Sequence, residues 1–195
     1  MSFINVSHIS KTFKVAKKQS GLLATLKSFV KREYKYIDAI KDISFNIEEG
    51  SIVGYIGQNG AGKSTTIKIL SGILIPDSGE CTIDGLTPWK DRKEYVAKIG
   101  VVFGQRSQLW WDIPADDTFN LLKDIYKIDE DKFKEKKDYL VKLLNIEDII
   151  QVPVRQLSLG QRMRCEIAAS LLHEPKILFL DEPTIGLDAI SKQIV

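Results

Sequence analysis

The sequence predicts an α/β fold with a largely parallel β-sheet. Short apolar runs typical of buried strands alternate with segments in which apolar residues recur at helical spacing. The chain has 195 residues, of which 44% are hydrophobic, so it can bury a sizeable core in one domain or in one domain with a small subdomain. Its sequence contains no internal repeat and no low-complexity linker.

The predicted elements follow one another along the chain. Strands are expected at residues 3–6, 43–47, 52–56, 81–83, 99–103 and 177–180. Helices are expected after Lys63, after Asp116, at residues 132–144 and after Ser158. The helix at 132–144 has one stripe that is formed by Phe133, Lys137, Leu140, Val141 and Leu144. Because residues 105–157 are locally helical and charged throughout, we expect them to form an appended helical subdomain.

Residues 14–37 read as an insertion. Apolar residues at helical spacing alternate there with basic ones, namely Leu22, Leu26, Phe29 and Val30 among Lys17, Lys18, Lys27, Lys31 and Arg32. This pattern predicts an amphipathic basic helix. Such a helix either packs on the core of its own domain or contacts lipid headgroups or a partner.

Charge and composition exclude several classes of protein. The 28 basic and 26 acidic residues give a net charge of +2, so no overall field favours a nucleic-acid partner. No apolar run reaches the roughly 20 residues that cross a bilayer, and the start lacks the apolar region of a secretory signal. Cys81 and Cys165 lie far apart without metal-ligand spacing, which predicts reduced, buried thiols. The protein is therefore expected in the cytosol unless a partner holds it at a membrane.

The strongest chemical signal is the segment GQNGAGKST at residues 57–65. It fits the pattern G-x-x-x-x-G-K-[ST] and lies between the apolar run SIVGYI and the helical pattern TTIKILSGIL. In such a P-loop, glycines let backbone N–H groups surround phosphate oxygens, and the following helix adds its positive N-terminal end. Lys63 is expected to neutralise the β- and γ-phosphates, and the Ser64 hydroxyl to bind Mg²⁺. The expected nucleotide-binding residues are Gly57, Gln58, Asn59, Gly60, Ala61, Gly62, Lys63, Ser64 and Thr65.

The segment ILFLDE at residues 177–182 adds two carboxylates to the end of a buried apolar strand. Asp181 suits a contact to Mg²⁺, either directly or through a water molecule. Glu182 can orient and deprotonate an attacking water. Because water would be the acceptor, these two residues predict hydrolysis of the nucleotide.

A third element is the segment LSLGQRMRCEIAAS at residues 157–170. Ser158 can cap a helix whose free N–H groups face outward, which is a second anion-binding geometry. Between the P-loop and the carboxylate strand, this segment resembles the signature motif of ATP-binding cassette (ABC) ATPases, and the resemblance covers essentially the whole chain. It implies that Ser158, Gly160 and Gln161 face the γ-phosphate held by the P-loop of a second subunit. Leu159 stands where the family usually has glycine, so its side chain must point away from the nucleotide.

The resemblance assigns further residues. Gln105, in VVFGQRSQLWW, matches the Q-loop glutamine that relates Mg²⁺ and the γ-phosphate to the helical subdomain. The metal ligands expected are therefore Ser64, Gln105 and Asp181. Asp188, in TIGLD, matches the D-loop aspartate at the dimer seam. Phe13 is expected to stack on adenine, with Tyr34 and Tyr36 as alternatives.

The resemblance also implies the architecture. It is a P-loop NTPase (RecA-like) core with a mainly parallel sheet, an antiparallel β edge and an inserted α-helical subdomain. The nucleotide-binding core is expected at residues 1–104 and 166–195, and the helical subdomain with the signature at 105–165. The family's switch histidine lies on a further strand, and neither His8 nor His173 matches it. We therefore expect residues 1–195 to be an incomplete ABC ATP-binding domain that lacks C-terminal strands and is inactive alone.

The segments FGQRSQLWWD and LSLGQRMRCE look like those of ATP-binding subunits of bacterial ABC-2 type exporters. The expected function is ATP hydrolysis by a dimer, with ATP and Mg²⁺, that powers export through separate integral membrane permease subunits. The protein would then lie on the inner face of the cell membrane, without a nucleic-acid partner. Trp110 and Trp111 are expected at the permease surface, unless at least one packs inside the helical subdomain. The alternative is a nucleotide-binding interaction protein without transport, either translation-factor-like or inactive because it is truncated.

Overall fold

The computed structural model describes residues 2–16, 34–104 and 107–184. The chain forms two compact units, Met1–Arg92 and Lys93–Val195, and each is described by itself. Among the described residues, no helix has the length and apolar character needed to cross a membrane.

The first unit contains an antiparallel sheet with the strand order β2-β1-β3. Strand β1 spans Ile4–Ala16, β2 spans Tyr34–Ile47 and β3 spans Ser78–Ile83. Ile4 pairs with Ile47 on one side and with Ile83 on the other. Burial alternates at the start of β1, where Ile4 and Val6 are buried and the residue between them is exposed, as expected for a sheet with one covered face.

Helix α2, Lys63–Leu70, is the only helix that lies wholly within the described part of the first unit. Its buried side is formed by Thr66, Ile69 and Leu70. The hydroxyl groups of Thr66 and Tyr55 lie 3.4 Å apart, which ties the helix to the chain that precedes the P-loop. The sequence-predicted helix after Lys63 is thus confirmed.

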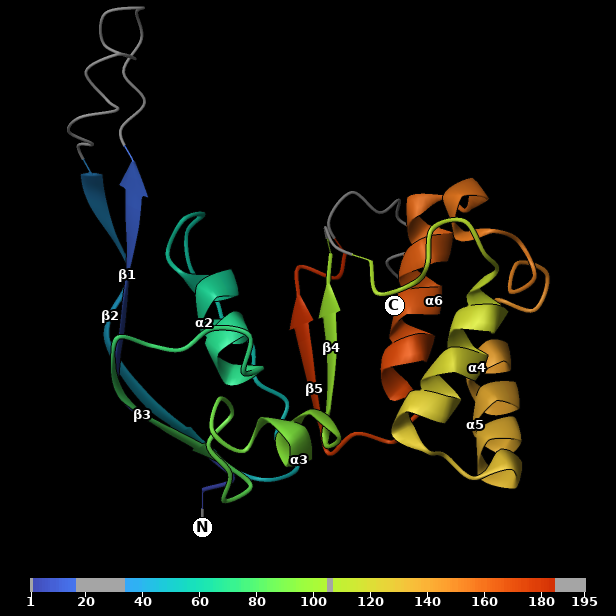
Figure 1. Cartoon of the computed structure of the whole chain (residues 1–195), viewed down its shortest axis with the longest axis horizontal. Coiled ribbons are helices and arrows are strands. Elements are labelled where there is room, and N and C mark those ends of the chain that lie inside the picture. The colour runs from blue at the N-terminus through green and yellow to red at the C-terminus, as the bar shows by residue number, and fades with distance from the viewer. Residues whose placement is uncertain (1, 17–33, 105–106, 185–195) are drawn as a thin grey trace, which may run out of the picture. The chain divides into compact units, whose positions relative to one another are not determined.

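The second unit combines two parallel strands with three long helices. Strand β4, Ile99–Phe103, pairs in parallel with β5, Ile177–Asp181, from Ile99 opposite Ile177 to Phe103 opposite Asp181. The helices are α4, Ala115–Tyr126, α5, Glu130–Leu143, and α6, Leu159–Leu171, with a 3-10 turn η1 at Val154–Gln156. The short helix α3, Arg92–Val96, begins at the boundary between the units. Figure 1 shows α6 between β4 on one side and α4 and α5 on the other, in agreement with its contacts to all three.

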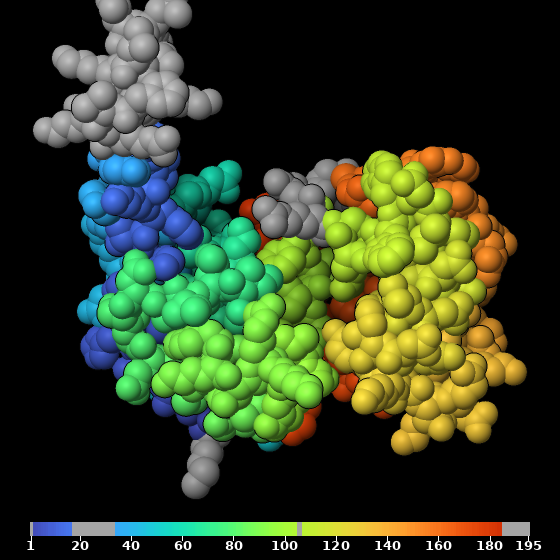
Figure 2. All heavy atoms as spheres, viewed as in Figure 1, coloured from blue at the N-terminus to red at the C-terminus, as the bar shows by residue number. Residues whose placement is uncertain are grey.

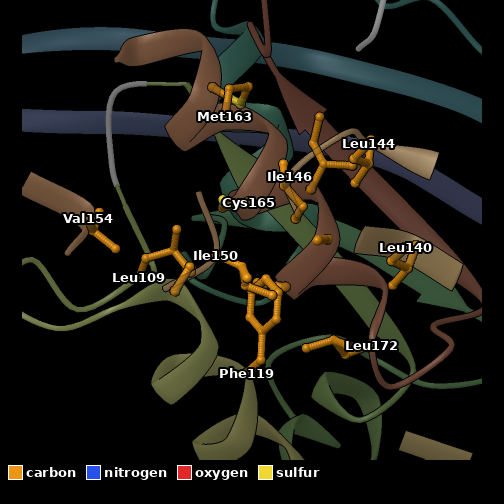
Figure 3. Close-up of a cluster of buried hydrophobic side chains, with 14 of the residues drawn as sticks. Leu109, Phe119, Leu140, Leu144, Ile146, Ile150, Val154, Met163, Cys165 and Leu172 are labelled. Atoms are coloured by element: carbon orange, nitrogen blue, oxygen red, sulfur yellow. The ribbon is translucent and has the colours of Figure 1, made fainter. Parts of the chain in front are cut away.

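The core of the second unit lies among these helices. Figure 3 shows Phe119 of α4, Leu140 of α5, Met163 and Cys165 of α6, and Leu109 from the loop before α4 as members of one buried cluster. The surface that α4 and α5 form is coloured yellow to orange in Figure 2. Asp129 is the N-cap of helix α5, and its carboxylate accepts hydrogen bonds from the N–H groups of Asp131 and Lys132. Within residues 107–157 the structure has the helices α4 and α5 and the 3-10 turn η1, joined by loops.

One sequence-predicted strand is absent. Residues 52–56 form no strand with any described segment, and the side chains of Ile52 and Ile56 are almost fully exposed. An apolar run of this kind becomes a buried strand only when other strands pair with it, and the described residues supply none. The prediction for 52–56 is therefore wrong in this structure, whereas the strands near 3–6, 43–47, 81–83, 99–103 and 177–180 are confirmed, the first three within longer strands.

The expected insertion at 14–37 is corrected at both ends. Residues 14–16 continue β1 and residues 34–37 begin β2, because the two strands pair as far as Ala16 opposite Tyr34. The hairpin therefore extends into the region that reads as an inserted helix. Residues 17–33, with the apolar and basic positions of the predicted amphipathic helix, lie outside the described residues.

Candidate functional site

The P-loop of the first unit is an exposed turn that leads directly into α2. The N–H group of Ala61 donates to the carbonyl of Gln58 over 3.1 Å, which closes the turn. Gly62 is the N-cap of α2 and has a left-handed backbone with φ of 89°. Helix α2 has no side-chain cap and no acidic residue in its first turn, so the positive end of the helix is unopposed by a side chain of its own first turn.

Lys63 folds back over this loop. Its ammonium group donates to the carbonyl oxygens of Gly57, at 2.8 Å, and of Gln58, at 2.9 Å. Both acceptors are neutral, so the positive charge remains available for an anion. The loop thus presents a cation and a helix N-terminus at one place, which is the arrangement that binds a chain of phosphates.

Gly62 also brings the loop against the sheet. A Cβ atom built on Gly62 would lie 2.2 Å from the carbonyl oxygen of Ala39 in β2. Ala39 lies two residues after Ile37, which pairs with Phe13 of β1. The expected adenine-stacking residue Phe13 is therefore on the part of the hairpin that the P-loop contacts, whereas Tyr34 and Tyr36 are further out, opposite Ala16 and Lys14.

The two carboxylates are in the second unit, at the carboxyl end of the parallel strand pair. Asp181 ends β5, and its carbonyl accepts a hydrogen bond of 2.9 Å from the N–H group of Gly104 at the end of β4. Glu182 follows with a positive φ of 54° and an exposed side chain. The edge at which parallel strands end is where α/β proteins place their reacting groups, and Asp181 and Glu182 lie at the end of one such strand.

The signature segment begins helix α6. The Ser158 hydroxyl accepts from the Gln161 N–H over 3.2 Å, while the Gln161 side chain accepts from the Ser158 N–H over 2.8 Å. This capping box holds an exposed serine at a helix N-terminus. Gly160 is buried, and Leu159 packs against the hydrophobic cluster of the second unit. The departure from glycine at Leu159 therefore places an apolar side chain on the core side of the helix.

Two expected site residues lie outside the described residues. They are Gln105, which follows Gly104 in the chain, and Asp188. The described residues bring the P-loop and the Phe13 hairpin together in one unit, and the carboxylates and the signature together in the other.

A buried carboxylate near the signature is missed by sequence reasoning. Glu166 of α6 is 3% exposed and accepts a 3.1 Å hydrogen bond from the N–H group of Gln108 and one from the Ser107 hydroxyl. The only signal in the sequence is its place in the apolar stretch of Cys165, Ile167 and Ala168 within a helix, where a charged residue is unusual.

The comparisons with known proteins agree with these motifs. The sequence profile described as "ABC transporter" matches residues 40–185 of the chain. The chain belongs to the ABC transporter family. Its fold is that of the ABC ATPase cassettes, because the ATP-binding cassette MJ0796, solved as a dimer in a post-hydrolysis state bound to ADP and Pi, superposes with a TM-score of 0.76. That comparison is at 28% identity and covers 98% of this chain and 78% of that one.

Curated relatives of this ABC cassette include the ABC transporter ATP-binding protein NatA of Bacillus subtilis (strain 168). NatA is 34% identical over 160 residues, which cover 82% of this chain and 65% of NatA. The linearmycin resistance ATP-binding protein LnrL of the same organism is 31% identical over 84% of this chain and 52% of its own. The methionine import ATP-binding protein MetN 2 of Enterococcus faecalis (strain ATCC 700802 / V583) is 36% identical over 82% of this chain and 48% of its own. This ABC cassette thus spans less than two thirds of the length of each of the three.

Proposed function

We propose that this ABC cassette binds ATP with Mg²⁺, hydrolyses it as a dimer and powers export through separate membrane permease subunits. The observation that carries the proposal is the P-loop, where Lys63 is held by the carbonyls of Gly57 and Gln58 beside the N-terminus of α2. Phosphate oxygens of ATP can take over the Lys63 ammonium from these neutral carbonyls, because an anion is the stronger partner for a cation. Phe13 would then stack on adenine, since its part of the hairpin contacts the P-loop through Ala39.

Mg²⁺ fits the residues of the proposed site. Ser64 in the first turn of α2 and Asp181 at the end of β5 offer the oxygen atoms that this ion prefers, and Gln105 is the third proposed ligand. Among the described residues, no group of three His, Cys, Asp or Glu side chains is arranged as a metal site. Mg²⁺ does not require one, because it takes most of its ligands from water and substrate phosphates. When bound, the ion would neutralise charge on the phosphate oxygens.

Glu182 is the proposed general base. Its exposed carboxylate follows Asp181 directly and can accept a proton from the water that attacks the γ-phosphate. Lys63 would stabilise the charge that develops on the phosphate oxygens. The Ser158 hydroxyl of a second subunit would donate a hydrogen bond to the same oxygens. Cleavage of the bond between the β- and γ-phosphates then yields ADP and inorganic phosphate.

The proposed permease surface is the loop that carries Trp110 and Trp111. Their side chains are 59% and 53% exposed, although their backbone is held on both sides. The Trp110 N–H donates to the Thr118 hydroxyl over 3.3 Å, and the Trp111 carbonyl accepts from the Arg155 N–H over 2.9 Å. Two exposed indole rings on a fixed backbone are typical of interface hot spots, because little conformational freedom is lost when a partner binds them.

The export direction rests on the resemblance of FGQRSQLWWD and LSLGQRMRCE to export systems, and the name of one relative, LnrL, refers to resistance. The test is to reconstitute the protein, expressed from its complete reading frame, with a membrane protein that co-purifies with it. We expect ATP-dependent accumulation of substrate inside inverted vesicles, where the cassette is outside. Accumulation only in vesicles of the opposite orientation would identify an importer, and ATP binding without phosphate release would favour the interaction protein.

A further inference from the structure

Glu166 joins helix α6 to the segment that follows Gln105 in the chain. The carboxylate accepts a hydrogen bond from the Gln108 N–H over 3.1 Å and another from the Ser107 hydroxyl. In return, the Gln108 side-chain amide donates to the backbone carbonyl of Glu166 over 3.0 Å. Three hydrogen bonds thus join residues 107 and 108 to one residue of α6.

The same segment is also held by its own packing. Leu109 is 4% exposed and lies in the buried cluster of Figure 3, and its N–H donates to the Ser107 hydroxyl oxygen over 3.1 Å. Beyond it, the Trp110 N–H binds the Thr118 hydroxyl of α4. Residues 107–110 are thus attached to both α6 and α4, less than ten residues after β4 ends.

Burying a carboxylate at this position costs free energy, because the charged group is removed from water. Burial raises the pKa of Glu166, while the Ser107 and Gln108 hydrogen bonds and the charge of Arg162 act in the opposite direction. An uncompensated buried charge is strongly unfavourable, and an apolar residue would fill this buried position without that cost. Packing of α6 therefore does not explain Glu166, whereas its two acceptor oxygens suit the two donors of residues 107 and 108.

We propose that Glu166 is a positioning residue that fastens residues 107–109 to α6. The chain after Gln105 and the N-terminus of α6 at Ser158 then move together when ATP binds. This inference rests on the proposed function, in which Gln105 and Ser158 both act on the γ-phosphate. Glu166 touches neither the nucleotide nor the attacking water. Its effect passes through the placement of the segment and of the helix N-terminus.

Two substitutions of Glu166 distinguish the effect of its hydrogen bonds from the effect of its negative charge. Glu166→Ala removes both acceptors. Glu166→Gln keeps the link, because the amide oxygen accepts from the Gln108 N–H, the amide N–H group donates to the Ser107 oxygen, and the Ser107 proton turns to the Leu109 carbonyl, 3.2 Å away. Ser170→Ala is the matched control, since buried Ser170 on the same helix binds only the Ile167 carbonyl of that helix.

The experiment measures amide hydrogen exchange of residues 107–110 and steady-state ATP hydrolysis in the protein expressed from its complete reading frame. We expect Glu166→Ala to lose protection of these amides and to lower kcat about ten- to a hundredfold with KM for ATP changed less than about threefold, the effect of a misplaced group rather than of lost binding. Glu166→Gln should restore both protection and most of kcat, and Ser170→Ala should leave both near the values of the unsubstituted protein. If Glu166→Ala does not fold, Ser107→Ala replaces it and should lower protection and kcat in the same direction.

The outcomes are distinct. Unchanged protection in Glu166→Ala, or lost protection with an unchanged kcat, would overturn the inference. So would a fall in kcat in Ser170→Ala as large as that in Glu166→Ala, because general destabilisation would then explain both. An unsubstituted protein that binds but does not hydrolyse ATP would remove the proposed function and the catalytic part of the inference, while lost protection in Glu166→Ala would still establish the attachment itself.

Discussion

The carbonyl oxygen of Ala39 occupies the place that a side chain on Gly62 would need. A Cβ on Gly62 would lie 2.2 Å from that oxygen, and Gly62 has a φ of 89°. We expect Gly62→Ala to shift the P-loop away from β2, to destabilise the first unit by more than about 1 kcal/mol and to abolish binding of ATP. Thermal unfolding and binding of a fluorescent ATP analogue measure the two effects.

Gly60→Ala is the matched control for this substitution. Gly60 also has a left-handed backbone, with a φ of 84°, but a Cβ there meets no atom within 4 Å. It should cost only the strain of about 1 kcal/mol that a left-handed alanine carries. Equal losses of stability at both positions would mean that the contact with Ala39 does not set the position of the P-loop.

The roles of Lys63 and Glu182 predict different defects. Lys63→Ala should abolish both tight binding and turnover of ATP, because it removes the cation that the loop holds. Glu182→Gln should keep ATP binding, stop phosphate release and trap a dimer, because only the proton acceptor is lost. Size-exclusion chromatography with ATP and Mg²⁺ and a phosphate-release assay distinguish the two, and Lys68→Ala in the last turn of α2 serves as the control. A Glu182→Gln protein with normal turnover would mean that another group is the base.

Trp110 and Trp111 are expected to bind the permease. Alanine at either position should reduce co-purification with the permease while changing the free energy of unfolding by less than about 1 kcal/mol, because both side chains are more than half exposed. Leu109→Ala is the contrast, since the buried Leu109 should cost about 2–5 kcal/mol instead. Normal recovery of the permease with destabilised Trp variants would place the indoles in the core of the subunit.

The two thiols should be unreactive in the folded protein. Burial raises the pKa of Cys81 and of Cys165 from the usual 9.0 to about 12. Below pH 9 both thiols are neutral in the folded and in the unfolded chain, so they do not affect the pH dependence of stability. Between pH 9 and about 12 the unfolded chain releases protons that the folded chain retains, so stability falls as the pH rises. Titration with Ellman's reagent at pH 8 should label the cysteines only at the rate of unfolding, and immediate labelling of either would show that it is accessible.

Replacement of Ile56 and of Ile69 by alanine should change the stability of the 195-residue chain by very different amounts. Ile69 of α2 is 1% exposed, and Ile69→Ala should cost about 2–5 kcal/mol. Ile56 is 94% exposed, and Ile56→Ala should change the free energy of unfolding by less than about 0.5 kcal/mol. Denaturant unfolding of both variants tests this, and a large loss in Ile56→Ala would mean that residues 52–56 are buried in a strand after all.

The elements that can be predicted from the sequence are those whose signals are local. The helix after Ser158 follows from its capping box, and the start of α2 follows from the glycines before Lys63. The fate of residues 52–56 depends on strand pairing with distant segments, which an apolar run does not reveal. Glu166 escapes prediction for the same reason, because its partners Ser107 and Gln108 lie almost sixty residues earlier in the chain.

The capping box at Ser158 lets one hydroxyl group act both as an acceptor within the helix and as a donor outside it. Its oxygen accepts the Gln161 N–H, which leaves the hydroxyl proton for a second acceptor outside the helix. Aspartate would cap α6 as well as serine does, but it would set a negative charge and no proton at the same point. Helix formation and the proposed recognition of a phosphate therefore place different demands on this position, and only a small neutral hydroxyl meets both.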